Sequence, residues 1–251
     1  MIKIKTPEEI KIMEEGGKIL ADTLFAVMDA VKVGVSELEI DALAEKMIRE
    51  RGGEPGFKLV EGYHHTICIS TNDVVVHGIP TNYRFKEGDV VGVDCGVFYK
   101  GFHTDMSETK IVGKASEEVK RFVSVGKEAL EAGMEKAIEG NRVGDISKAI
   151  QDIVEGKNGY SIVLSLVGHG VGRELHEEPE IPGYLTKSIA KTPLLKKGMV
   201  IAVEVIYNMG GADVVYTEDD DWTIKTADGS LAGLFERTVA ITGNKLHIIT
   251  K

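Results

Sequence analysis

The sequence reads KEGDVVGVD at residues 86–94 and KKGMVIAVE at residues 196–204, and these two stretches decide the fold. Each one is a turn, then an apolar run, then a carboxylate: Asp94 in the first and Glu204 in the second. A short apolar run bounded by a glycine turn is typical of a buried strand. The two stretches therefore predict two equivalent strands that each present one acid.

The second stretch lies 110 residues after the first, and this offset holds over much of the chain. The same offset aligns Leu20 with Leu130, Val33-Gly34 with Val143-Gly144, Ile40 with Ile150 and Glu45 with Glu155. A constant offset without a gap indicates an internal repeat. We therefore predict one α+β domain over residues 1–251, built from two pseudo-symmetric α/β halves at roughly 6–110 and 116–241.

Each half has the same expected order of elements, helices first and strands after them. Apolar residues recur at helical spacing from residue 7 to 31, where Thr6 can cap the helix with Glu9 three residues later. Ser36 can cap a second helix, which ends at Gly52-Gly53. The remaining predicted segments are helices at 116–139 and 145–156 and strands at 66–70, 73–77, 89–99, 160–168, 198–208 and 234–241.

Composition and charge restrict the class of protein. The 251 residues are 43% hydrophobic and 28% charged, which is enough to build a sizeable core. The net charge of −10 argues against a nucleic-acid surface or an anionic membrane, because phosphate binding needs clustered cations. The two cysteines, Cys68 and Cys95, suggest a reducing compartment. With neither a signal peptide nor an apolar run of the ~18 residues that span a bilayer, we expect a soluble, cytoplasmic protein.

Four acids lie in or beside the predicted strands: Asp94, Asp105, Glu204 and Glu236. A hairpin would bring Asp105 beside Asp94, eleven residues earlier. One buried carboxylate is equally well explained by a salt bridge or a cap, but four in one place repel one another unless cations neutralise them. Four acids suit two divalent ions. Oxygen-rich ligation with one imidazole favours Mn, Fe, Co or Zn over a tetrahedral structural zinc site.

The candidate imidazole comes from GHGVGRELHEEP at residues 168–179, where His169 and His176 stand seven residues apart. The segment superficially resembles a glycine-rich phosphate loop. It lacks the lysine of a P-loop, and the strand–helix context of a dinucleotide fold is poor. Glycines on either side of His169 instead let the backbone approach a metal centre closely. We therefore expect His169 to be part of the site.

Taken in order along the chain, these motifs resemble those of the methionine aminopeptidases, within the wider "pita-bread" family of metallopeptidases. The resemblance covers nearly the whole chain and includes VHGIP at residues 76–80. The bacterial-like type I class fits best, because only 32 residues separate Glu204 from Glu236 and no zinc-finger extension precedes the catalytic domain. This resemblance implies the pita-bread fold, with two related halves around a dinuclear metal site.

The resemblance also implies roles for individual residues. It makes Asp105 and Glu236 bridging ligands, places Asp94 on one of two divalent metal ions, and places His169 and Glu204 on the other. The remaining implied site residues are His77 and His176, which contact substrate and take part in catalysis, and Tyr63, Cys68 and Trp222, which line or border the methionine pocket. Val205 and Arg237 depart from the family pattern, which commonly has proline and histidine at these positions.

The implied activity is removal of the N-terminal methionine from nascent polypeptides, with Glu204 passing the proton of the attacking water to the leaving amine. Ribosome association would fit such an enzyme, although no motif reports on it, and we expect a monomer. Two alternatives stay open: an X-Pro aminopeptidase or dipeptidase of the same fold, and a non-enzymatic binding protein on that fold.

Overall fold

The computed structural model describes residues 1–218 and 220–251 of the chain. Its helices are α1 (Pro7–Ala30), α2 (Glu37–Glu50), η1 (Phe57–Leu59), α3 (Glu117–Glu135), α4 (Val143–Gln151), the π-helix η2 (Asp152–Lys157) and η3 (Ile189–Lys191). Its strands are β1 (Glu54–Pro55), β2 (Ile67–Thr71), β3 (Val74–Val76), β4 (Val90–Tyr99), β5 (Phe102–Ile111), β6 (Ser161–Ile162), β7 (Gly168–Gly170), β8 (Glu177–Ile181), β9 (Val200–Asn208), β10 (Val214–Tyr216), β11 (Ile224–Thr226) and β12 (Ala232–Ala240).

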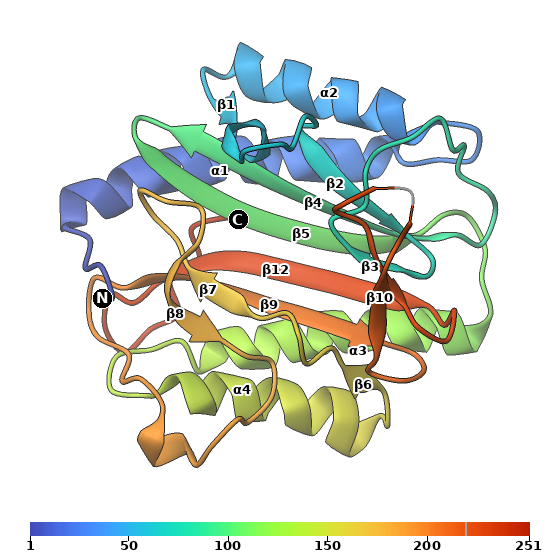
Figure 1. Cartoon of the computed structure of the whole chain (residues 1–251). Coiled ribbons are helices and arrows are strands. Elements are labelled where there is room, and N and C mark those ends of the chain that lie inside the picture. The colour runs from blue at the N-terminus through green and yellow to red at the C-terminus, as the bar shows by residue number, and fades with distance from the viewer. Residues whose placement is uncertain (219) are drawn as a thin grey trace.

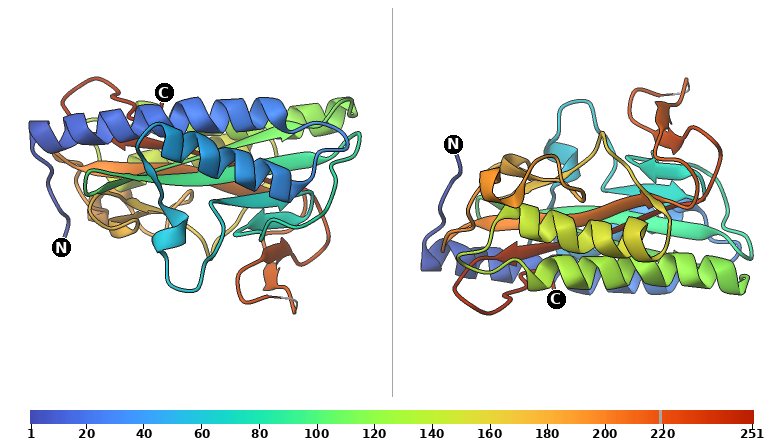
Figure 2. Two further views of the ribbon diagram at one scale, coloured as in Figure 1. Left: turned by 90° about the horizontal axis from the view of Figure 1, so that it is seen from above. Right: turned by 90° about the horizontal axis from the view of Figure 1, so that it is seen from below.

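A large antiparallel sheet forms the centre of the molecule, in the order β1-β4-β5-β12-β9-β7-β8 (Figure 1). Strand β2 pairs with β4, and β6 pairs with β9. A second, three-stranded sheet has the order β10-β11-β3. Helix α1 packs on β4 and β5, and α3 packs on β9 and β12. Figure 2 shows α1 and α3 against the same face of the sheet, with the β10 region on the opposite side.

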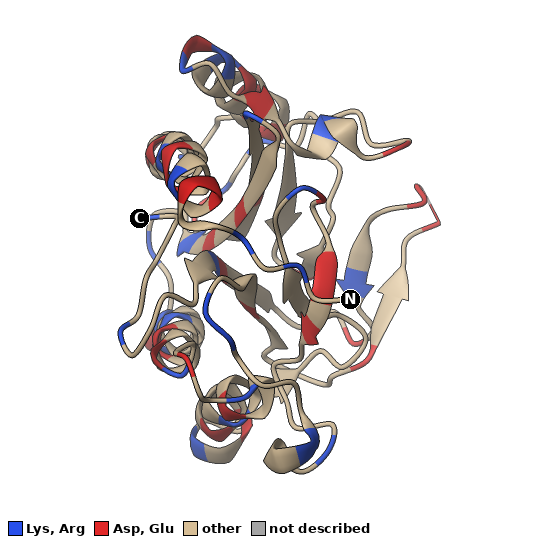
Figure 3. Cartoon of the chain, turned by 90° about the vertical axis from the view of Figure 1, so that its left-hand side faces the viewer, with Lys and Arg blue, Asp and Glu red and all other residues tan. Residues whose placement is uncertain are grey.

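The helices begin where the sequence predicts them to begin. Thr6 caps α1 and Ser36 caps α2, and each forms a capping box with the glutamate three residues later. Apolar residues of α1 and α2 bury one hydrophobic core against β4, whereas those of α3 and α4 bury another against β9 and β12. Each half of the sheet therefore rests on its own helix pair. Both charge signs occur along the outer helices (Figure 3).

The α+β prediction is confirmed, but the predicted strand at 160–168 is wrong over most of its length. Only β6 at its start is a strand, and β7 begins at its last residue. The N–H of Val163 still donates to the Ile206 carbonyl on β9, and the chain leaves the sheet after it; Val163 is buried in a small apolar cluster, and Leu166 packs against that cluster. Leu166 thus packs in the interior although the backbone there has left the ladder, which an apolar run alone does not reveal. Strands β1, β5, β8, β10 and β11 lie outside the predicted strand segments.

Among the described residues, no helix is long and apolar enough to cross a membrane. Both cysteines are buried and unbonded to one another. Whether the two halves arose by duplication stays a prediction.

Candidate metal centre and substrate pocket

Three of the predicted acids form a row across four neighbouring strands. Asp94 on β4 lies opposite Ser107 on β5, Ser107 lies opposite Glu236 on β12, and Glu236 lies opposite Glu204 on β9. Directly opposed residues of an antiparallel pair point to the same face of the sheet. The register alone therefore gathers these carboxylates on one face, away from the face that the helices cover.

Asp105 and His169 each lie two residue positions away from this row, measured along the strands. Asp105 precedes Ser107 by two residues on β5, and His169 lies opposite Ala202, which precedes Glu204 by two. Because side chains alternate across a strand, a displacement of two residues keeps them on the same face. All five residues predicted as metal ligands therefore point toward one region of the sheet.

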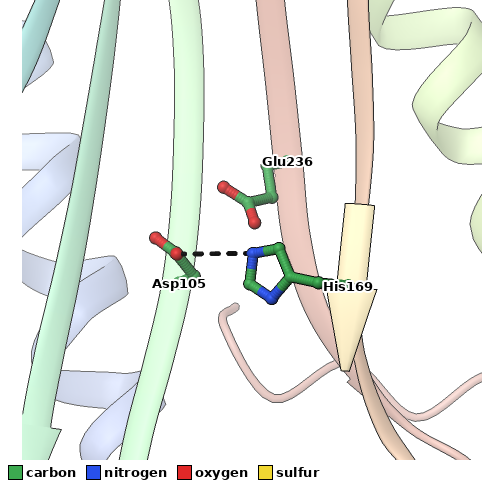
Figure 4. Close-up of side chains that lie close together, drawn as sticks. All are labelled: Asp105, His169 and Glu236. Carbon is green, nitrogen blue, oxygen red and sulfur yellow. Dashed lines mark ion pairs between the residues drawn. The ribbon is translucent and has the colours of Figure 1, made fainter. Parts of the chain in front are cut away.

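Asp105, His169 and Glu236 lie closest together, since one potential ligand atom from each falls within 4.8 Å of the others (Figure 4). The Nε2 atom of His169 is 3.9 Å from Asp105 Oδ2 and 3.6 Å from Glu204 Oε1. Its Nδ1 atom lies 2.9 Å from the carbonyl oxygen of Gly170, to which it can donate. That bond leaves the Nε2 lone pair free to face the acids, as a metal-ligating imidazole requires.

Two carboxylate oxygens of the row provide a test of whether a cation fits here. Asp94 Oδ1 and Glu236 Oε1 are buried and have no hydrogen-bond partner among the described residues. A buried, unpartnered charged oxygen is strongly unfavourable. Divalent cations coordinated by carboxylate oxygens would satisfy both atoms, so the donor set fits such ions.

The protonation equilibria of the site support the same conclusion. Burial raises the pKa of Asp94 to about 7, and burial followed by the charge of Asp94 raises the pKa of Glu204 to about 8. The pKa values of Asp105 and Glu236 are also raised, first by burial and then by the neighbouring acids. Burial, and then the nearby His176, lowers the pKa of His169 to about 3. The bare protein thus disfavours charge at all five positions, and bound cations would reverse that preference.

Two further histidines line the same cavity as the acids. The ring of His176 contacts that of His169 edge-on, with 4.4 Å between centroids. Burial lowers the pKa values of both His77 and His176. His77 has a φ of 56°, a left-handed backbone that is uncommon outside glycine and found at functional sites. Gly78 follows it because a Cβ there would lie 2.0 Å from the carbonyl oxygen of Ile69.

The acids line one part of a cavity of about 200 Å³ whose other walls are mainly apolar. The predicted pocket residues Tyr63, Cys68 and Trp222 all line it. Tyr63 donates from its hydroxyl to the carbonyl of Ile67 at 2.8 Å, and its ring meets Trp222 edge-on at 5.1 Å. Cys68 lies opposite Asp94 in the sheet, at the boundary between the apolar part and the acids.

Several lining residues were missed at the level of sequence: Phe57, Val60, Leu166, Ile206 and Leu234. Two of them carried a usable signal, because Ile206 and Leu234 lie two residues from Glu204 and Glu236 on the same strand face. Phe57 comes from a short helical turn that reaches the cavity because Gly96 has no side chain: a Cβ there would lie 2.7 Å from the Phe57 ring. No local pattern reports such a contact.

Comparison with known proteins agrees with this geometry. The model of metallopeptidase family M24 matches residues 11–242. Methionine aminopeptidase of Clostridium perfringens is 44% identical over 250 residues, covering 100% of this chain and 99% of that protein. The crystal structure of methionine aminopeptidase from Thermotoga maritima superposes with a TM-score of 0.96 at 41% identity and full coverage of both chains.

Prolidase from Pyrococcus furiosus is more distant, with a TM-score of 0.79 and 26% identity. It matches 99% of this chain, but only 65% of the prolidase chain is covered. The shared architecture confirms the predicted pita-bread fold. Since both the family model and a relative of 44% identity cover nearly the whole chain, this protein belongs to metallopeptidase family M24 and, within it, to the bacterial-type methionine aminopeptidases.

Proposed function

We propose that this chain hydrolyses the first peptide bond of polypeptides that begin with methionine, at a centre of two divalent metal ions. The observation that carries the proposal is the junction of a row of acids with an apolar cavity of about 200 Å³. A cavity of this kind accepts a single side chain, while the acids lie where the adjoining peptide bond would be. The names of the relatives support the same activity.

The ligands of the two ions are, on this proposal, Asp94, Asp105, His169, Glu204 and Glu236. Asp105 and Glu236 would serve as ligands shared by both ions, Asp94 would hold one of them, and His169 and Glu204 would hold the other. When bound, such ions lower the pKa of water and polarise a carbonyl oxygen. Mn, Co, Fe or Zn would suit this oxygen-rich donor set with one imidazole.

The protein's own groups supply proton transfer and orientation. Glu204 accepts the proton of the attacking water and passes it to the leaving amine, a role open to it when it is ionised. His77 and His176 donate hydrogen bonds to the carbonyl oxygen as negative charge develops on it. Their lowered pKa values keep both rings neutral at pH 7, so each retains one N–H for this purpose.

The apolar walls select the methionine side chain. Cys68 offers a polarisable sulfur, and Tyr63 and Trp222 offer ring edges, all of which interact favourably with a thioether. The Tyr63 hydroxyl is already bonded to Ile67, so it presents no unpaired polar group to the substrate. An unbranched, flexible side chain fits this apolar cavity better than a β-branched side chain.

The proline-directed peptidases are the less favoured alternative. The prolidase match leaves about a third of that longer protein uncovered, whereas the methionine aminopeptidases match end to end at higher identity. A non-enzymatic binding protein is also disfavoured, because all five candidate ligands face one region of the sheet.

The remaining parts of the proposal concern the partners of the protein, its location in the cell and its oligomeric state. The partners are polypeptide N-termini that begin with methionine, and neither nucleic acid nor membrane is required. We place the protein in the cytoplasm, as a monomer. Association with the ribosome would be consistent with nascent chains as substrates.

Release of free methionine tests the proposal most directly. Met-Ala-Ser and Ala-Pro-Ala should be incubated with metal-free protein and with protein given Mn²⁺ or Co²⁺. We expect metal-dependent cleavage of Met-Ala-Ser alone. Cleavage of Ala-Pro-Ala alone would assign the protein to the proline-directed class. Absence of cleavage in protein that carries two ions would favour a binding function.

A further inference from the structure

The two halves of the large sheet meet at a short seam between β5 and β12. Within the described part of the chain, only two residue pairs are in ladder register there: Glu236 with Ser107, and Arg237 with Met106. By contrast, β4 pairs with β5 over ten residues and β12 pairs with β9 over nine. Two acids of the candidate metal centre, Asp105 and Glu236, therefore lie on neighbouring strands that are joined by only two ladder pairs.

A threonine hydroxyl replaces direct backbone pairing at each end of this seam. At one end, the Asp105 N–H donates to Thr238 Oγ1 at 3.0 Å, and the Thr238 hydroxyl donates to the Asp105 carbonyl at 2.8 Å. At the other, the Leu234 N–H donates to Thr109 Oγ1 at 3.1 Å, and the Thr109 hydroxyl donates to the Leu234 carbonyl at 2.6 Å. Counted from the pair of Glu236 and Ser107, the pair of Thr238 and Asp105 lies two residues along in one direction. The pair of Leu234 and Thr109 lies two residues along in the other.

The hydroxyl is needed at Thr238 because its backbone is engaged elsewhere. Its N–H donates to Thr250 Oγ1 at 3.0 Å, and its carbonyl accepts from the Ile249 N–H at 2.9 Å. In an antiparallel strand, the N–H and C=O of one residue face the same neighbour, which for Asp105 is β12. Asp105 and Thr238 are almost fully buried, so these two backbone groups would be costly to leave unpaired.

We propose that Thr238 is a positioning residue for Asp105. Its hydroxyl fixes the stretch of backbone from which the Asp105 carboxylate reaches the space shared with His169 and Glu236. The inference rests on the proposed function only in taking Asp105 as a metal ligand. Thr109 makes the same pair of bonds to Leu234, which carries no ligand atom, so the chain provides its own matched control.

The test compares Thr238→Val, Thr238→Ser and Thr109→Val in the full-length protein. Metal-free protein is titrated calorimetrically with Mn²⁺, and stability is measured separately by urea unfolding. Both valine variants lose two buried hydrogen bonds, so both should unfold at lower urea concentration. Only Thr238→Val should weaken Mn²⁺ binding, by about 10- to 100-fold, as is typical when support for a metal ligand is removed. Thr238→Ser keeps the hydroxyl and should bind Mn²⁺ like the unmodified protein.

Two results would overturn the inference: unchanged Mn²⁺ affinity in Thr238→Val, or an equal loss of affinity in Thr109→Val. In the second case, the loss would follow from a weakened seam in general. If Thr238→Val does not fold, Thr238→Cys takes its place, because a thiol keeps the shape but is a weak donor and acceptor. Methionine release is measured separately. A protein that binds Mn²⁺ but releases no methionine would contradict the proposed function and leave the positioning result intact.

Discussion

At the scale of single residues, the candidate centre consists of groups whose charged forms are disfavoured in the bare protein. Burial is the largest cause of the raised pKa values at Asp94 and Glu204 and of the lowered pKa at His169. Each group gives up hydration that only a bound cation can replace. The same residues should therefore control metal affinity, pH dependence and activity together.

The metal-free protein should lose stability as pH rises from 7 to about 8.5. A carboxyl whose pKa is raised in the folded state stabilises the fold below its unfolded pKa, and this stabilisation is lost as pH rises through the folded value. For Asp94 and Glu204 the folded values are about 7 and about 8. Histidines whose pKa values are lowered are largely neutral in both states above pH 7, so they do not offset the trend.

Urea unfolding with EDTA present, at several pH values in this window, measures the effect. With saturating Mn²⁺ the slope should flatten or reverse, because the ions hold the carboxylates ionised. A metal-free protein whose stability stays constant or rises over this range would contradict the assignment of raised pKa values to these acids.

Replacing His169 by alanine should abolish tight metal binding and methionine release without unfolding the protein. The only hydrogen bond of the ring within the described residues is to the adjacent Gly170, so little structural support is lost. Loss of a ligand should weaken affinity beyond the roughly 10- to 100-fold typical of outer-shell changes. Metal content and methionine release check this, with His247→Ala as the control. His247 pairs with Glu14 and lines no part of the candidate site.

At the scale of elements, the segment between β7 and β8 carries His176 and is held from outside by the N-terminal residues. Lys5 Nζ lies 2.7 Å from Glu177 Oε2, with side-chain exposures of 4% and 1%. The other oxygen of Glu177 accepts from the backbone N–H of Arg173 at 2.9 Å. Gly172 leaves room for Lys5, since a Cβ there would lie 2.4 Å from Lys5 Cε. The N-terminus thus stabilises a segment next to the metal centre.

Lys5→Met should destabilise the protein by about 3 kcal/mol, because it removes the nearest cation from a buried carboxylate. This is the low end of the usual range, since Lys3 Nζ remains 3.4 Å from Glu177. Lys18→Met is the matched control, because its pair with Asp22 is exposed and should contribute less than about 1 kcal/mol. Urea unfolding distinguishes the two. Equal, small effects would show that the buried pair contributes little.

At the scale of the whole molecule, the metal centre joins two halves that have separate hydrophobic cores. The proposed ligands come from β4 and β5 on one side and from β7, β9 and β12 on the other. Arg237, a departure from the family pattern, reinforces the join: its guanidinium pairs with Glu108 and donates to the carbonyls of Ser107 and Glu236 at 2.9 and 2.7 Å. Ions bound at this position should stabilise the entire fold.

Mn²⁺ at a hundred times its dissociation constant should raise the free energy of unfolding by about 2.7 kcal/mol per independent site. For a chain of this size that corresponds to roughly 5–10 °C in Tm. Thermal unfolding with EDTA and with Mn²⁺ measures the shift, which His169→Ala should largely lose. If the His169→Ala variant showed the full shift, the ions would be binding elsewhere.

The sequence by itself determined the two carboxylate-bearing strands, the capped helices and the α+β class. These follow from local periodicity and from side chains within a few residues of one another, such as Thr6 with Glu9. The positions of the four acids and of His169 indicated the candidate ligands, and the family resemblance supplied the role of each. The interruption of the predicted strand at 160–168 could not be predicted, because apolar residues buried outside the ladder give the same sequence pattern as apolar residues buried within it.

Only the tertiary structure decided how the acids meet. The register that aligns Asp94 with Ser107, Glu236 and Glu204 depends on the pairing of β5 with β12, which joins Ser107 to Glu236 more than a hundred residues later and which no local pattern specifies. The bond from Thr238 to Asp105 likewise joins residues far apart in sequence. The sequence specifies the chemistry of each side chain. The distances between these side chains, which make them a site, are set by the packing of the whole chain.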